Sequence, residues 1–71
     1  MDAVSELHEF MQLLYQAGMS ADQVVESGFS FACFQTLENN ALGGLQQTQM
    51  QLIAARAVHQ VARELGLPLQ G

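Results

Sequence analysis

The sequence predicts an all-α fold of three to four short helices in a small bundle, with a long C-terminal helix that dimerises. Apolar residues recur at helical spacing in segments that glycines separate. Alternating apolar and polar runs joined by turn dipeptides, which would indicate strands, are missing. With 71 residues, the chain is expected to form one small helical domain over residues 1–71. We therefore expect a helix content well above the roughly one third of typical globular domains.

The first predicted helix covers about residues 2–17. Asp2 is a typical N-cap, and Gly18 suits the left-handed conformation that ends many helices. The apolar residues at helical spacing are Val4, Leu7, Met11 and Leu14. This segment has the clearest amphipathic pattern in the chain.

A second, short helix is expected over about residues 21–27. Ser20 and Gln23 have the spacing of a capping box at its start. Gly28 is expected to end it, because glycine is unfavourable inside a helix.

The third helix is expected over about residues 31–42, with Ser30 as its N-cap. Its expected inward residues are Phe31, Phe34, Leu37 and Leu42, and its expected outward residues are Gln35, Glu38 and Asn39. Gly43 and Gly44 follow and favour a bend or a short turn, although a continuous helix stays open as an alternative.

The last helix, over about residues 45–65, is expected to be the longest. Gly66 and Pro68 end it. One apolar stripe contains Met50, Ile53, Ala54, Ala57, Val58, Val61 and Leu65, and a second contains Leu45, Leu52, Ala55 and Ala62. Because this helix is apolar on two sides, we expect it to be either the central helix of the domain or the seam of a dimer.

The charge is divided unevenly along the chain. The formal net charge is -5, from seven acids and two basic residues, and the first 38 residues contain six acids and no base. This balance argues against binding to a phosphate backbone, and 49% hydrophobic residues argue against a disordered tail. Arg56, His59 and Arg63 share one stripe of the last helix. The stripe is either a solvated face or a contact for an acidic surface on a second copy or on a partner protein.

Catalytic chemistry is not expected from this sequence. Cys33 lies among phenylalanines, which indicates a core residue. His8 and His59 lack a metal-ligating residue three or four positions further along the chain, and no glycine-rich phosphate loop occurs. We therefore predict no enzyme activity, no catalytic residue, no cofactor and no metal site.

An aromatic cluster is the second candidate contact surface. Phe29, Phe31 and Phe34 cannot all point the same way from one short helix, so at least one of them should lie near the surface. The cluster, with Tyr15, is either the core of a small domain or a hydrophobic contact. The candidate partner-binding residues are Arg56, His59, Arg63, Phe29, Phe31 and Tyr15.

Three further segments are compatible with other functions. Residues 19–37 have the outline of a helix-turn-helix, but the second helix offers no lysine or arginine to DNA. Ser30 resembles the attachment serine of acyl or peptidyl carriers, although Phe29 stands where carriers typically have aspartate. Residues 47–55 are similar in composition to the small alanine- and glutamine-rich subunits of R-bodies, the polymerising ribbons of some bacteria, which implies a self-assembling structural subunit.

The function expected from the sequence is that of a small acidic helical protein-protein interaction module, an adaptor, antagonist or regulator of a partner protein, acting as a homodimer. The absent catalytic residues, the doubly apolar last helix and the charge asymmetry motivate this hypothesis. No apolar run reaches the roughly 18 residues of a membrane span, so we expect a cytoplasmic protein. The self-assembling subunit, and a small DNA-binding or carrier-type domain, remain the alternatives.

Overall fold

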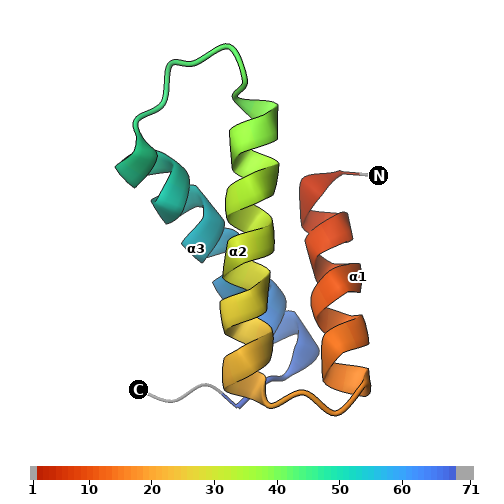
Figure 1. Cartoon of the computed structure of the whole chain (residues 1–71). Coiled ribbons are helices and arrows are strands. Elements are labelled where there is room, and N and C mark those ends of the chain that lie inside the picture. The colour runs from red at the N-terminus through yellow and green to blue at the C-terminus, as the bar shows by residue number, and fades with distance from the viewer. Residues whose placement is uncertain (1, 69–71) are drawn as a thin grey trace.

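Three helices pack against one another in the computed structural model, which describes residues 2–68. They are α1 (Ala3–Gln16), α2 (Ala21–Asn39) and α3 (Gln47–Leu65), and residues 2–68 contain no strand. Figure 1 shows α1 and α2 running antiparallel, with α3 descending obliquely across them. The all-α prediction is confirmed, with three helices. Met1 and residues 69–71, which the expected 1–71 domain includes, lie outside the described residues.

Side-chain and backbone caps define both ends of α1. The Ser5 N–H donates to Asp2 Oδ1 over 2.7 Å. At the other end Gly18 has φ +99°. The Met19 N–H donates to the Leu14 carbonyl over 3.2 Å, and the Gly18 N–H donates to the Tyr15 carbonyl over 3.1 Å. These two bonds form a Schellman motif, which satisfies carbonyl groups that the helix end leaves without partners.

The expected break at Gly28 is wrong, because α2 runs through it without interruption. Gly28 is buried inside the helix, and a Cβ built on it would stand 2.6 Å from Met11 Sδ. The missing side chain lets α1 and α2 approach closely at this point. The expected helices 21–27 and 31–42 are therefore one helix that ends at Asn39, and Ser30 lies in its middle instead of capping a helix.

The connection from α2 to α3 contains the glycine pair. Gly43 and Gly44 have φ of +87° and +114°, a region that residues with a side chain rarely adopt. The Gln46 N–H donates to Gln49 Oε1 over 3.0 Å at the start of α3. With 19 residues, α3 has the same length as α2, so the expectation that it is the longest helix is wrong.

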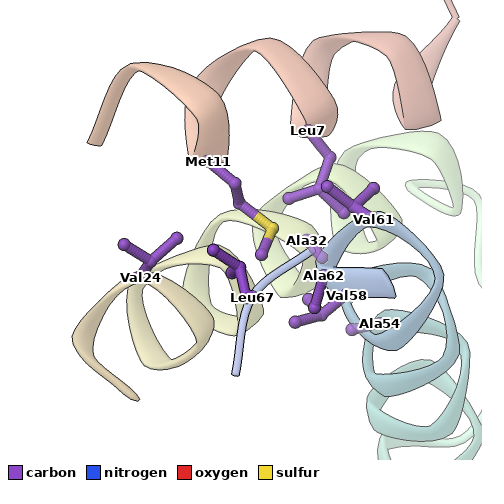
Figure 2. Close-up of a cluster of buried hydrophobic side chains, with 9 residues drawn as sticks. All are labelled: Leu7, Met11, Val24, Ala32, Ala54, Val58, Val61, Ala62 and Leu67. Atoms are coloured by element: carbon purple, nitrogen blue, oxygen red, sulfur yellow. The ribbon is translucent and has the colours of Figure 1, made fainter. Parts of the chain in front are cut away.

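The core lies between the three helices and is wholly apolar among the described residues. Figure 2 shows its nine side chains, which are Leu7, Met11, Val24, Ala32, Ala54, Val58, Val61, Ala62 and Leu67. Leu67 reaches the core because the Schellman motif at Gly66 turns the chain back, with the Leu67 N–H donating to the Ala62 carbonyl over 3.0 Å. Phe10 of α1 and Phe31 of α2 extend the core by stacking, with ring centroids 4.3 Å apart and planes 13° apart.

Candidate functional site

The outward side of α2 carries large apolar side chains. Phe34 is 68% exposed and Leu37 is 54% exposed. Together with Phe29, Ser30 and Cys33 they line a shallow hollow of about 270 Å³, and we call these five residues the α2 apolar face. The expectation that Phe34 and Leu37 point inward is therefore wrong.

Helical phase explains why these residues point outward. The buried residues of α2 are Val24, Gly28 and Ala32, which are spaced four residues apart and therefore lie on one side of the helix. Positions 34 and 37 fall on the other side. Gln35, expected outward, is instead half-buried, and its Nε2 donates to the Ala3 carbonyl over 2.9 Å. The side of α2 that α1 and α3 approach carries Val24, Gly28 and Ala32, and Phe34 and Leu37 stay outside the core.

The outward side of α3 carries both arginines and one histidine. Arg56, His59 and Arg63 are all exposed. They line one surface hollow of about 450 Å³ together with Leu52, Ala55 and Gln60. We call these six residues the α3 cationic face. The structure thus brings the three predicted residues onto a single surface, and Leu52, which is 56% exposed, adds an apolar side chain to it.

The three aromatic candidates do not form a single site. Phe29 and Phe31 are half-buried and pack against the core, and Phe31 does so by stacking on Phe10. Tyr15 is exposed in the last turn of α1. Phe34 is the member of the aromatic cluster that lies at the surface, as expected for at least one of the three phenylalanines, but neither Phe34 nor Leu37 was predicted as a partner-binding residue. No signal within α2 identifies them, because the buried side of this helix is set by the approach of α1 and α3.

A third surface lies where the first turn of α1 meets the end of α2. Asp2, Glu6 and Glu38 line a polar hollow of about 260 Å³. Ala3 and Gln35 also line an adjoining hollow of about 280 Å³, whose other walls include Val4, Leu45 and Ile53. Six of the seven acidic residues therefore lie at or on α1 and α2, while both arginines and Glu64 lie on α3.

These hollows, as far as the described residues line them, contain few side chains that bind metal ions or react as nucleophiles. Within residues 2–68, no three or more histidine, cysteine, aspartate or glutamate side chains are grouped so that they could hold a metal ion. Cys33 carries a free, half-buried thiol beside Phe34 and Leu37. No helix in this part of the chain has the length and apolar character needed to cross a membrane.

The chain matches no known family model, and no curated protein or solved structure is significantly similar to it. Two of its surfaces have contrasting chemistry: the α2 apolar face and the α3 cationic face.

Proposed function

We propose that this protein is a small helical protein-protein interaction module that acts as a homodimer and binds a partner protein as an adaptor, antagonist or regulator. The observation that carries the proposal is the exposure of Phe34 and Leu37 on the outward side of α2. Burying one such side chain fully is worth about 1.5–3 kcal/mol. A contact that covers both residues therefore supplies a substantial driving force for association.

The size of the core supports the same conclusion. Three of its nine buried side chains are alanines, Ala32, Ala54 and Ala62, which contribute little apolar area. Domains of this size commonly gain stability by oligomerisation. An apolar face outside a small core is the arrangement expected if association completes the burial of apolar surface.

Sedimentation velocity tests the dimer. We expect the wild-type chain to be dimeric at tens of micromolar, and the Phe34→Gln/Leu37→Gln variant to be monomeric with an unchanged far-UV spectrum. Leu13→Gln/Leu42→Gln is the matched control, because it removes two exposed leucines outside the α2 apolar face and should leave the dimer intact. A wild-type chain that stays monomeric at several hundred micromolar contradicts the proposal.

Binding to a different protein is tested with the same variants. A binding protein recovered from lysate of the source cell is purified, and its affinity is measured by calorimetry against wild type, Arg56→Glu/Arg63→Glu and the Leu13→Gln/Leu42→Gln control. A role for the α3 cationic face predicts at least tenfold weaker binding by the arginine variant alone. Equal affinities would show that the arginines do not contact this partner protein.

A self-assembling structural subunit is the second candidate. The observation in its favour is that the α2 apolar face and the α3 cationic face lie on the outward sides of different helices, so a head-to-tail contact between them could repeat from copy to copy. Negative-stain microscopy separates the two candidates. Filaments or sheets would support the subunit and contradict the closed dimer.

The DNA-binding and carrier alternatives each require a local feature that α2 does not have. A helix-turn-helix over residues 19–37 requires a turn near Gly28, where α2 is continuous. A carrier requires its serine at a helix start, whereas Ser30 lies in the middle of α2. Neither function is proposed for this chain.

A further inference from the structure

Four exposed residues form a straight stripe along α2. The stripe contains Leu37 and the residues that precede it by 3, 7 and 11 positions, which are Phe34, Ser30 and Glu26. Eleven residues make three turns of about 3.7 residues and span about 16 Å, so the four side chains lie on one side of the helix. The stripe is apolar at the end nearest Asn39 and acidic towards the N-terminus of the helix.

A stripe with the same intervals runs along α3. It contains Leu52 and the residues that follow it by 3, 7 and 11 positions, which are Ala55, His59 and Arg63. Leu52, His59 and Arg63 are exposed, Ala55 is half-buried, and all four belong to the α3 cationic face. This stripe is apolar at its start and cationic at its end.

The two stripes are complementary when they face each other in antiparallel orientation. Leu37 then meets Leu52, so that two exposed leucines cover each other. Phe34 meets Ala55, which places the largest side chain of one stripe opposite the smallest of the other. Glu26 meets Arg63, which pairs opposite charges. One alignment thus matches apolar character, size and charge at the same time.

We infer that the second copy of this chain is the partner of the α2 apolar face: the outward side of α2 in each copy packs antiparallel against the outward side of α3 in the other, with Leu37 opposite Leu52 and Glu26 opposite Arg63. This inference rests on the proposed homodimer and specifies its contact. In this arrangement a two-fold axis relates the two copies, each contact occurs twice, and the assembly is a closed dimer.

Charge reversal at Glu26 and Arg63 tests the register. Glu26→Arg and Arg63→Glu should each weaken the dimer about tenfold at low salt, because each pair occurs twice per dimer and becomes repulsive. The double variant restores opposite charges and should return the dissociation constant to within about threefold of wild type. Glu9→Arg on α1 is the control for net charge and should change it less than threefold. If the losses of dimer affinity in the two single variants simply add in the double variant, the register is wrong.

An engineered disulfide tests the same alignment independently. In this register, Cys33 of one copy faces Arg56 of the other, since each lies four residues from its leucine. Under mild oxidation, Arg56→Cys should give a covalent dimer on a non-reducing gel. Gln60→Cys, an exposed position one turn further along α3, should give at least fivefold less. A wild-type dimer linked through Cys33 alone would instead show that α2 packs on α2, and would overturn the inference.

The outcomes separate this inference from the proposed function. If the chain dimerises through Phe34 and Leu37 but fails the charge and disulfide tests, the proposed function stands and the α2–α3 register is wrong. If the chain never dimerises, both proposals are wrong. Circular dichroism of each variant confirms that the altered residues, all exposed or half-buried, have not unfolded the helices.

Discussion

Gly28 of α2 lies directly against Met11 of α1. A Cβ built on Gly28 would stand 2.6 Å from Met11 Sδ and 2.9 Å from Met11 Cγ, both closer than side chains normally pack. Both residues are buried. The absence of a side chain at position 28 therefore allows the methionine to fill the space between the two helices, as Figure 2 shows for Met11 at the centre of the core.

Gly28→Ala is expected to destabilise the fold despite the better helix propensity of alanine. Alanine favours a helix by about 1 kcal/mol over glycine, but an overpacked core typically costs about 1–3 kcal/mol. We expect a net loss of about 1 kcal/mol in the free energy of unfolding, measured by urea denaturation. A stabilised Gly28→Ala variant would show that Met11 moves aside at no cost.

The Met11→Ala background is the control for the Gly28 substitution. Met11→Ala alone should cost about 2–5 kcal/mol, because it leaves a cavity in the core. In that background the added Cβ no longer meets Met11, so Gly28→Ala should become neutral or stabilising. The sign change is a coupling free energy, and two effects that merely add would contradict the packing argument.

Gly66→Ala is expected to lower the free energy of unfolding by about 1–2 kcal/mol. Gly66 has φ +72° at the end of α3, a left-handed conformation that strains a residue with a Cβ. Gly66→Asn should cost less, because asparagine tolerates this region better than alanine does. Gln60→Ala, at an exposed position of the same helix, should change stability by less than about 0.5 kcal/mol. Thermal denaturation of the three variants measures the difference.

Gln35→Glu is expected to loosen the contact between the first turn of α1 and the end of α2. It replaces the Nε2 that donates to the Ala3 carbonyl with a carboxylate oxygen, in a region that already contains Glu6 and Glu38. We expect a loss of about 1–2 kcal/mol at pH 7. Gln35→Met removes the hydrogen bond without adding a charge and should cost about 1 kcal/mol. The gap between the two variants should close by pH 3, and a constant gap would exclude charge as its cause.

The Asp2 cap predicts a small dependence of stability on acidic pH. The Ser5 N–H holds the pKa of Asp2 below its ordinary value of 3.8. The carboxylate therefore stabilises α1 fully above that value, and its contribution is lost as the pH falls through the lower pKa of the folded state. Compared with Asp2→Asn, which caps without titrating, the wild-type chain should lose more helicity at 222 nm between pH 5 and pH 2. Parallel curves would show that the cap does not depend on the charge.

The faces of α2 show where sequence patterns stop being informative. The large apolar residues Phe34 and Leu37 look like core residues, and hydrophobicity alone assigns them to the interior. The core instead takes Val24, Gly28 and Ala32. That choice depends on how closely α1 and α3 approach α2, which no periodicity within α2 reveals. The cationic stripe of α3 was predictable, because charged residues at helical spacing stay in solvent whichever neighbour packs behind them.

The amino-acid sequence by itself determined the local structure of this protein. Asp2 and Ser20 accept hydrogen bonds as N-caps, and Gly18 and Gly66 end helices, because each depends on chemistry within four or five residues. Only the tertiary structure decided that Gly28 continues a helix and that Phe34 faces solvent. The cost of about 1 kcal/mol for a helical glycine is offset by contacts with Met11, which lies 17 positions away in the chain and is brought near only by folding.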